Sequence, residues 1–285
     1  MNKKNSSYQL MSIPAATLYT VFFIVPLLQG IRLSFTDWSG FGKATFIGFE
    51  NYAKFFKDAR ALGDIKTTIL FAIGSALLLN LLGLAYALIM NKSFKFQGVI
   101  RVIIYLPAII SPLIMGYIWY FLLQPGRGFV YRAFEYLGNP ITWNWMGKYS
   151  YTILVLILVN VWQYAGMTMI IYLAGLKSIS SEYYESAKID GATKHQIFTR
   201  ITLPLLTPSI RINVVTNIIG SLSVFDIIMS LTEGGPGYAT ESLSIYIMRM
   251  CYGNKTGYST AVAMILFMLI LIPVLISFKL TKSRS

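Results

Sequence analysis

Long runs of hydrophobic residues alternate along the chain with shorter polar segments. A helix needs about 20 mostly apolar residues to cross the roughly 30 Å hydrocarbon core of a bilayer, and six runs are long enough. We therefore predict an all-α integral membrane protein with six transmembrane helices. The predicted spans are residues 12–31, 65–90, 102–123, 151–176, 210–231 and 258–280.

The first hydrophobic run follows Lys3 and Lys4, a pattern that is also typical of a secretory signal peptide. Its apolar stretch is longer than that of a signal peptide, and no small-x-small cleavage site follows it before Arg32. We therefore interpret residues 12–31 as an uncleaved transmembrane helix.

Basic residues in the connecting segments favour one orientation. If the N-terminus lies in the cytoplasm, the inner segments hold 11 Lys and Arg in 60 positions, whereas the outer segments hold 10 in 86. The inner segments are then residues 1–11, 91–101, 177–209 and 281–285. Because cytoplasmic loops are enriched in Lys and Arg, this bias places both termini in the cytoplasm. Residues 1–285 are expected to form a single transmembrane domain.

Composition supports this class and excludes others. Of the 285 residues, 55% are hydrophobic and only 12% are charged, and the mean hydropathy is +0.61. A soluble domain has about 25% charged residues. The net charge of +13 fits an anionic membrane surface rather than nucleic acid, because the basic residues lie between apolar runs. One Cys and one His supply neither an internal disulfide nor a zinc-ligand set.

The longest inner segment, residues 177–209, has the pattern of two short helices around a glycine turn. Ser180 or Ser181 is placed to cap the first helix. Gly191 is placed to end it, since glycine readily adopts the left-handed conformation just past a helix. Thr193 is placed to cap the second helix. Composition alone is also typical of an amphipathic element that lies on the membrane surface.

The order of residues in this segment is more specific than its composition. Glu185-Ser-Ala-Lys-Ile-Asp-Gly-Ala192, followed by Phe198 and Pro204, resembles the EAA loop of binding-protein-dependent ABC importer permeases. Ser186 stands where that motif has alanine, which exchanges one small residue for another. The match covers about twenty residues with several fixed positions, so it is far more specific than a lone glycine motif.

Other segments resemble the carbohydrate branch of the same family, which includes maltose and glycerol-phosphate permeases. These segments are Leu173–Lys177, Phe225-Asp226, Thr232, Gly234-Gly235-Pro236 with Thr240, Phe49-Glu-Asn51-Tyr52 and the pair Thr67-Thr68. The resemblance covers most of the chain and implies a MetI-like core of six helices.

In that family the EAA loop forms a coupling helix that docks on a cytoplasmic ATPase, whose closure drives alternating access. The residues that the resemblance assigns to ATPase coupling are Glu185, Ser186, Ala187, Asp190, Gly191, Ala192, Phe198 and Pro204. Glu185 would offer a charge-assisted contact and Gly191 the turn. Asp190 has an alternative role, the capping of the helix after the turn.

The resemblance also implies partners. They are a second related permease chain in a heterodimer, two copies of an ABC ATPase and an extracytoplasmic solute-binding protein that meets the segment 232–240. The chain contains no G-x-x-x-x-G-K-[ST] run, so we expect ATP-Mg to bind the separate ATPase. We expect a transport subunit of the bacterial cytoplasmic membrane, in contact with lipid. It should bind no cofactor, metal or nucleic acid and should not itself be an enzyme.

Polar residues inside two predicted spans are candidates for a substrate path. In the fifth span they lie within an arc of about 120°, and in the fourth they follow an i, i+3, i+4 spacing. The candidates are Asn160, Gln163, Tyr164, Asn213, Thr216, Asn217, Ser223 and Asp226. Uncharged amides and hydroxyls suit a neutral polyhydroxyl solute. Small and polar residues also join helices to one another, which is the alternative role for each of them.

Two other function classes stay open. An ion-coupled secondary transporter for a small polar solute would have several buried ionisable groups, and Asp226 is the only acid placed clearly inside a span. A membrane enzyme would need a clustered acid–base or metal constellation, and His195 stands alone in the inner loop. Pro107 and Pro112 are expected to kink the third span, and Pro273 to disturb the sixth.

Overall fold

The computed structural model describes residues 12–280. Within this range the chain forms helices and loops, with one isolated β-bridge between Thr36 and Phe46 and no strand. The predicted all-α class is confirmed for these residues. Two compact units are formed within this range: one by the residues up to Leu62 with Tyr246–Phe267, the other by Gly63–Ile245 with the residues from Met268 onward. The basic residues expected at the two chain ends, Lys3, Lys4, Lys282 and Arg284, lie outside the described range.

The first unit begins with the helix Ser12–Ser34, whose second half is α2 (Val25–Ser34). The short helix α3 (Glu50–Phe55) is fastened to the end of this helix by Asn51. The Nδ2 group of Asn51 donates hydrogen bonds to the carbonyl oxygens of Ser34 at 2.9 Å and Thr36 at 2.8 Å. Asn51 is buried, so its amide satisfies carbonyl groups that a helix end leaves without partners.

Asp58 joins three helix ends of the first unit. Its Oδ2 accepts hydrogen bonds from the hydroxyl of Tyr246 at 2.6 Å and the hydroxyl of Tyr258 at 3.4 Å. Its Oδ1 accepts from the backbone N–H groups of Arg60 at 3.0 Å and Ala61 at 3.3 Å, at the start of α4. Burial raises the pKa of the Asp58 carboxyl, but these hydrogen bonds outweigh burial and leave the pKa below its usual value.

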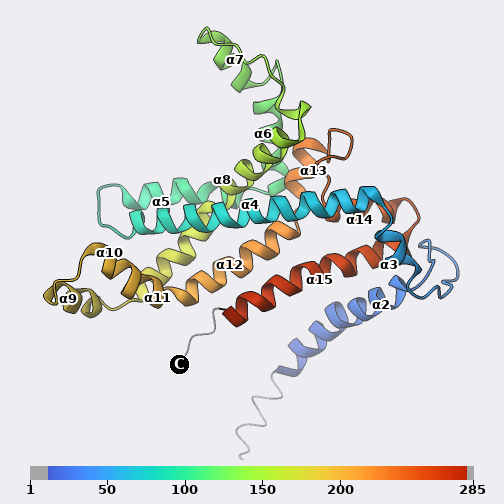
Figure 1. The fold of residues 1–285 in the computed structure, drawn as a ribbon, viewed down its shortest axis with the longest axis horizontal. Coiled ribbons are helices and arrows are strands. Elements are labelled where there is room, and N and C mark those ends of the chain that lie inside the picture. Colours follow the sequence, from blue (N-terminus) through green and yellow to red (C-terminus); the bar gives the residue numbers. More distant parts are fainter. Residues whose placement is uncertain (1–11, 281–285) are drawn as a thin grey trace, which may run out of the picture. The chain divides into compact units, whose positions relative to one another are not determined.

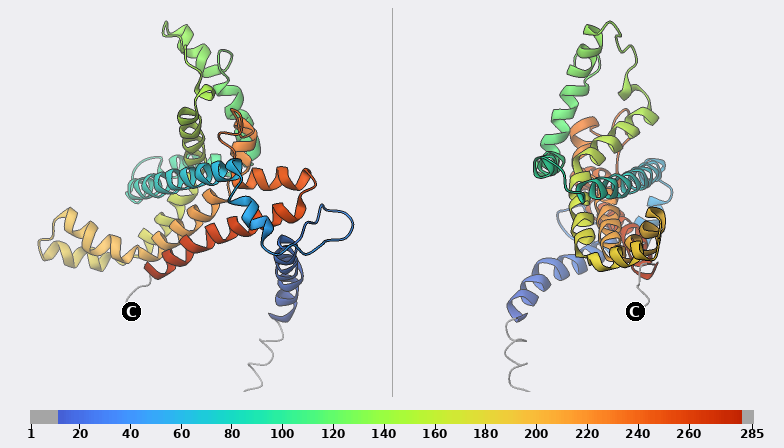
Figure 2. Two further views of the ribbon diagram at one scale, coloured as in Figure 1. Left: turned by 45° about the vertical axis from the view of Figure 1, so that its right-hand side comes forward. Right: turned by 90° about the vertical axis from the view of Figure 1, so that its left-hand side faces the viewer.

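The second unit holds most of the remaining helices (Figure 1). Their bounds are α4 Ala59–Met90, α5 Gln97–Tyr105, α6 Pro112–Leu123, α7 Phe129–Tyr136, α8 Tyr149–Ser178, α9 Ser181–Ile189, α10 Lys194–Ile197, α11 Leu203–Leu205, α12 Thr207–Leu222 and α13 Asp226–Thr232. Three helices contribute residues to both units: α4, α14 (Leu243–Tyr252) and α15 (Thr256–Leu280). Within the second unit, α7 and the pair α9–α10 lie at opposite ends (Figure 2).

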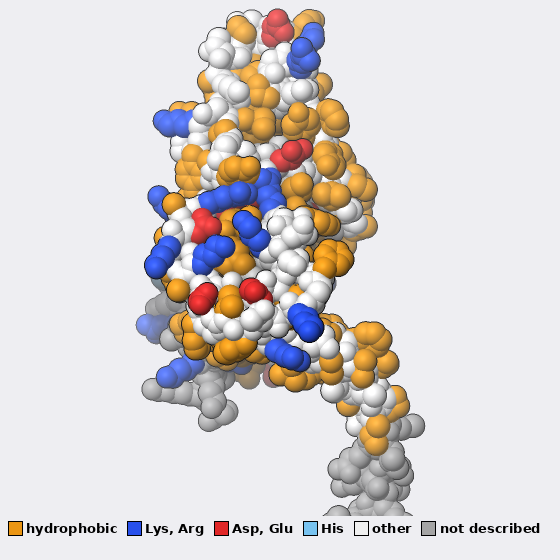
Figure 3. Space-filling view, turned by 90° about the vertical axis from the view of Figure 1, so that its right-hand side faces the viewer, with side chains coloured by type: hydrophobic (Ala, Val, Ile, Leu, Met, Phe, Trp, Pro, Cys, Tyr) orange, Lys and Arg blue, Asp and Glu red, His pale blue; other side chains and the backbone are white. Residues whose placement is uncertain are grey.

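Within residues 12–280, four helices are long and apolar enough to cross a membrane. They are Ser12–Ser34, Ala59–Met90, Tyr149–Ser178 and Thr256–Lys279, and they contain the predicted spans 12–31, 65–90 and 151–176 and nearly all of 258–280. The face drawn in Figure 3 carries both hydrophobic side chains and a group of Lys and Arg side chains. Hydrophobic side chains of the long helices are also exposed, for example Leu70, Ile73, Leu77 and Leu81 of α4. Lipid solvates such surfaces, so they need no protein partner.

The other two predicted spans are broken helices. The region 102–123 falls on Gln97–Ile109 and Pro112–Leu123, which are bent by 98°. The region 210–231 falls on α12 and α13, which are bent by 43°. A kink was expected in the first, from Pro107 and Pro112, but the second was expected to be continuous. It is interrupted at residues 223–225. There the hydroxyl of Ser242 donates a hydrogen bond to the carbonyl oxygen of Val224 at 2.8 Å.

Contacts with helix α8 stabilise the bend in the third span. The side-chain Nε2 of Gln163 donates a hydrogen bond to the carbonyl oxygen of Ile110 at 3.2 Å, between the two halves of the span. One turn further, Gly166 lets the backbones touch, because a Cβ there would lie 2.3 Å from the Ile104 oxygen and 2.7 Å from the Tyr105 Cα. The bend is therefore fixed by tertiary contacts as well as by proline.

Candidate functional site

The loop after α8 folds as the sequence predicts. Ser180 caps α9, its hydroxyl accepting the Glu182 N–H at 3.4 Å. At the other end, Gly191 has a φ of +73°, and the N–H of Ala192 donates to the carbonyl oxygen of Ala187 at 2.9 Å. The Gly191 N–H donates to the Lys188 oxygen at 3.1 Å. This pair of bonds is the Schellman motif, which explains why glycine follows Asp190.

A second cap follows directly. The hydroxyl of Thr193 accepts the Gln196 N–H at 3.3 Å, and the Gln196 side chain accepts the Thr193 N–H at 2.8 Å. This capping box starts α10, so Thr193 and not Asp190 caps the helix after the turn. The alternative role considered for Asp190 is therefore wrong. Its carboxyl is exposed at the end of α9.

The predicted coupling residues divide into exposed and packed side chains. Glu185, Ser186, Asp190, Gly191 and Pro204 are exposed, Ala192 and Phe198 are half-buried, and Ala187 is buried. Ile189, in the last turn of α9, is 86% exposed. An isoleucine open to water between Lys188 and Asp190 is a feature of a contact surface, and the sequence pattern alone did not reveal it.

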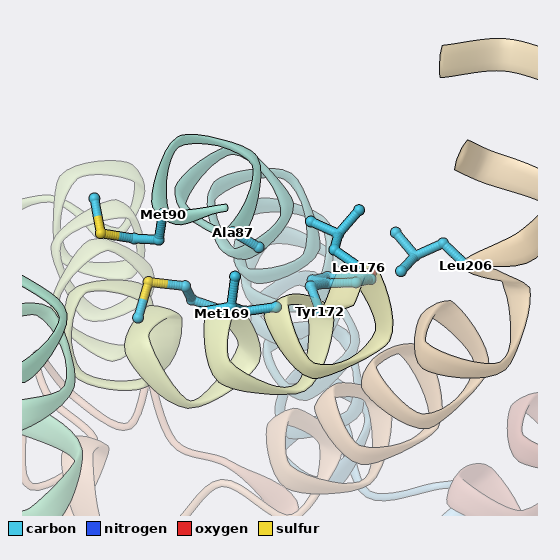
Figure 4. Close-up of a cluster of buried hydrophobic side chains, with 7 residues drawn as sticks. Ala87, Met90, Met169, Tyr172, Leu176 and Leu206 are labelled. Carbon is cyan, nitrogen blue, oxygen red and sulfur yellow. The ribbon is translucent and has the colours of Figure 1, made fainter. Parts of the chain in front are cut away.

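Packing connects this loop to the long helices. The side chain of Leu206, between α11 and α12, is fully buried in a cluster with residues of α4 and α8 (Figure 4). The other members of the cluster are Ala87, Met90, Met169, Tyr172, Leu173 and Leu176. The hydroxyls of Tyr184 on α9 and Thr202 lie 3.4 Å apart, which ties α9 to the segment that leads into Leu206. Packed side chains therefore connect α9 to α8 and α12.

A cavity of about 250 Å³ opens between α8, α12 and α13. Seven of the eight predicted path residues line it: Asn160, Tyr164, Asn213, Thr216, Asn217, Ser223 and Asp226. The remaining lining residues are Leu79, Pro112, Met167, Thr168, Ile171, Gly220, Ser221, Val224, Phe225 and Ile227. The break between α12 and α13 forms one side of this cavity, which is why five successive residues from Ser223 to Ile227 line it.

Two of the lining residues also join helices. The Nδ2 group of Asn213 donates to the Thr168 carbonyl oxygen at 3.3 Å. The Asn217 amide and the Thr168 hydroxyl lie 3.4 Å apart and are hydrogen bonded. Asn213 and Asn217 are both buried, so their amides stabilise the contact between α8 and α12. Thr168 was missed in the sequence, although it lies four residues after Tyr164 and so on the same face of α8.

The other five predicted residues in the cavity have free polar groups. Among residues 12–280, no hydrogen bond engages the side chains of Asn160, Tyr164, Thr216, Ser223 and Asp226. Thr216, Ser223 and Asp226 are exposed, and Tyr164 is half-buried. Amide, hydroxyl, phenol and carboxylate groups that have no internal partner can each exchange a hydrogen bond with a solute.

Gln163 does not line the cavity. Its side chain is fully buried and bonds to Ile110 instead, at the break of the third span. Trp162 is also outside the lining residues, and its ring makes an edge-to-face contact with Trp119 at 5.3 Å. Both residues therefore pack against neighbouring helices in this structure.

The segment 232–240, expected to meet a binding protein, is fixed by the N-terminal part of α4. The hydroxyls of Thr232 and Thr240 lie 3.2 Å apart within the segment. The Thr67 hydroxyl donates to the Ala239 carbonyl oxygen at 3.1 Å, and the Thr68 hydroxyl accepts the Leu243 N–H at 3.0 Å. The threonine pair at the start of the second span therefore positions a loop distant in sequence.

Known proteins resemble the chain over nearly its whole length. Residues 79–284 match the family described as "Binding-protein-dependent transport system inner membrane component". The chain is 31% identical over 277 residues to the trehalose/maltose transport system permease protein MalF of Thermococcus litoralis, covering 96% of this chain and 93% of that protein. It is 29% identical over 282 residues to the probable starch degradation products transport system permease protein AmyD of Thermoanaerobacterium thermosulfurigenes, covering 97% and 94%.

A solved structure of an ABC transporter has the same fold as this chain. The fold matches a chain of a bacterial alginate ABC transporter in complex with an alginate pentasaccharide-bound periplasmic protein, with a TM-score of 0.85 and 26% identity over 98% of this chain and 95% of that chain. The comparisons confirm the resemblance that the segment 185–204 carries. They support an ABC importer over an ion-coupled carrier.

Proposed function

The chain belongs to the family of binding-protein-dependent transport system inner membrane components, and from this premise we propose that it is the permease subunit of an ATP-driven importer of sugars or oligosaccharides. The observation that carries the substrate class is the cavity between α8, α12 and α13. It is lined by five polar side chains that make no hydrogen bond within the described part of the chain. Amides and hydroxyls exchange hydrogen bonds with a polyhydroxyl solute without trapping it electrostatically. The relatives named for maltose, trehalose and starch products support the same class.

Energy reaches the cavity through the loop 177–209. The exposed face of α9, with Glu185, Lys188 and Ile189, docks on a separate ATPase that holds ATP-Mg. Closure of the ATPase moves α9, and the buried side chain of Leu206 passes the movement to α8 and α12, which line the cavity. The remaining coupling residues, Ser186, Ala187, Asp190, Gly191, Ala192, Phe198 and Pro204, shape and support this docking element.

The whole importer needs further chains. Residues 1–285 act as one transmembrane domain, with both termini and the loop 177–209 in the cytoplasm of a bacterial cell and the rest in its cytoplasmic membrane. A second related permease chain completes the cavity as a heterodimer partner. Two copies of the ATPase bind on the cytoplasmic side. A solute-binding protein delivers the sugar at the outer side, where Thr67 and Thr68 hold the segment 232–240.

Reconstitution tests this function. The permease pair, its ATPase and its binding protein are incorporated in proteoliposomes, and uptake of a panel of labelled mono- and oligosaccharides is measured. We expect uptake that requires both ATP and the binding protein and that a protonophore leaves unchanged. Uptake that persists without ATP and is abolished by the protonophore would identify an ion-coupled carrier and contradict the proposal.

A further inference from the structure

The charge of the cavity is set by a single side chain. Among the described residues that line it, Asp226 is the only one with a formal charge, and no Lys, Arg or His is present to balance it. The carboxyl is exposed to the cavity, and neither a hydrogen bond nor an ion pair engages it among residues 12–280. Ionisable groups inside a membrane domain are costly and are generally kept for function.

Asp226 is the first residue of α13, where the helix dipole favours a negative charge, but among residues 12–280 no side chain is hydrogen bonded to its carboxyl. Its backbone carbonyl accepts the hydroxyl of Ser230 at 2.7 Å, but this bond uses the main chain and not the carboxyl. The other side chains free in the cavity, Asn160, Tyr164, Thr216 and Ser223, are neutral. A carboxylate differs from them in two ways: it only accepts hydrogen bonds, and it repels an anion.

We propose that Asp226 selects the charge of the transported saccharide, accepting hydrogen bonds from sugar hydroxyl or ammonium groups and rejecting uronate and phosphorylated sugars. This inference rests on the proposed function and deepens it, because it adds a charge class to the sugar. Two carboxylate oxygens can accept from neighbouring hydroxyls of one sugar ring, which gives a neutral sugar a bond stronger than an amide or hydroxyl offers. A carboxylated sugar meets repulsion at the same point, and a protonated amino sugar meets attraction.

Direct binding to the purified complex in nanodiscs tests this role, because the cavity then selects without the binding protein. The probes are maltotriose, maltotriose oxidised to a carboxylate at C6 and a trimer of glucosamine, and binding is measured by saturation-transfer NMR at low salt. In the unaltered complex we expect the uronate to bind at least ten-fold more weakly than maltotriose, and the glucosamine trimer to bind at least as tightly.

Asp226→Asn keeps the size of the side chain and removes its charge. We expect this variant to bind maltotriose several-fold more weakly and to bind the uronate within three-fold of maltotriose. Glu135→Gln is the matched control: it removes the same charge from an exposed residue of α7 that does not line the cavity, so the original order of the three sugars should persist. Thermal unfolding of both variants should match that of the unaltered complex, because neither side chain is hydrogen bonded.

The outcomes separate this inference from the proposed function. If the unaltered complex binds the uronate as well as maltotriose, or if Asp226→Asn keeps the ten-fold discrimination, Asp226 does not select charge. Failure of all three sugars to bind a complex that imports sugar in proteoliposomes also overturns the assignment. A complex that imports no sugar at all contradicts the proposed function instead.

Discussion

The backbone N–H of Ala192 donates a hydrogen bond to the carbonyl oxygen of Ala187 at 2.9 Å, and Gly191 between them has a φ of +73°. A Cβ at Gly191 would meet no atom within 4 Å, so the requirement for glycine is conformational and not steric. The end of α9, and with it the direction of the face proposed to dock on the ATPase, depends on this one residue.

Gly191→Pro should uncouple the transporter. Proline fixes φ near −65° and has no N–H, so it cannot adopt the left-handed conformation or donate to Lys188 as Gly191 does. We expect the variant to insert and fold but to lose co-purification of the ATPase and uptake. Gly191→Ala costs about 1–2 kcal/mol of local conformational strain, so partial uptake should remain.

The chain supplies a control with the same geometry. Gly138 ends α7 with a φ of +79°, and the N–H of Asn139 donates to the Phe134 carbonyl oxygen at 3.0 Å. Gly138→Pro therefore breaks an equivalent helix end outside the loop 177–209 and should leave ATPase binding intact. Equal loss of ATPase binding in both proline variants would show that the effect is general misfolding and not uncoupling.

Substitution of Gln163 should change stability, whereas substitution of Asn160 should change uptake, although both residues are amides on α8. Gln163→Met removes the bond to the Ile110 carbonyl at the break of the third span, so we expect a loss of about 1 kcal/mol in unfolding free energy with the order of sugar preferences unchanged. Asn160→Leu removes a free amide from the cavity and should reduce uptake with little change in stability. Thermal unfolding and uptake of both variants would be measured together, and a reversed pattern would exchange the two roles.

Gly166→Ala should destabilise the second unit. The added Cβ would lie within 3 Å of backbone atoms of Ile104 and Tyr105, which cannot move without shifting α5, and overpacking of this kind costs about 1–3 kcal/mol. Gly98→Ala on α5 adds the same methyl group where nothing lies within 4 Å. It should stabilise the helix by about 0.5–1 kcal/mol. Detergent-solubilised variants with equal unfolding temperatures would argue against close packing at Gly166.

Asp58 should give the first unit an acid-sensitive stability. Its pKa in the folded protein lies below the usual value of 3.8, so the folded state favours the charged carboxyl. The stabilisation is therefore present above pH 3.8 and is lost as the pH falls through the lower, folded value. Asp58→Asn should flatten this acid limb in unfolding curves measured from pH 6 downward. Glu50→Gln, an exposed acid of α3, should leave the limb in place.

Much of the fold and of the loop could be predicted from the sequence, because local rules govern them. Hydrophobic length gave the long helices, and cap chemistry placed Ser180, Gly191 and Thr193 at the helix ends that the structure has. Neither hydrophobic length nor helix capping predicts where a transmembrane span bends or in which direction. The 98° bend depends on Gln163 and Gly166 of a distant helix, and the interruption at residues 223–225 contains no proline to signal it.

The cavity was only partly predictable for the same reason. A polar arc on α12 identified the face, but it could not separate the amides that bind Thr168 from the groups that stay free. That division depends on how α8 and α12 meet. Gln163 lies three residues from Asn160, a spacing that also fits a lining residue. Its side chain is instead drawn to Ile110 by the packing of α5 and residues 106–110 against α8.

The break after α12 has a consequence for how the specificity of this transporter can change. A helix end leaves its last carbonyl groups without helical partners, and two residues of that last turn, Gly220 and Ser221, line the cavity. Main-chain acceptors of this kind are the same whatever side chain is encoded, so mutation cannot remove them one by one. A preference for hydroxyl-rich solutes would then persist through sequence drift, whereas the proposed discrimination of charge rests on one codon, that of Asp226.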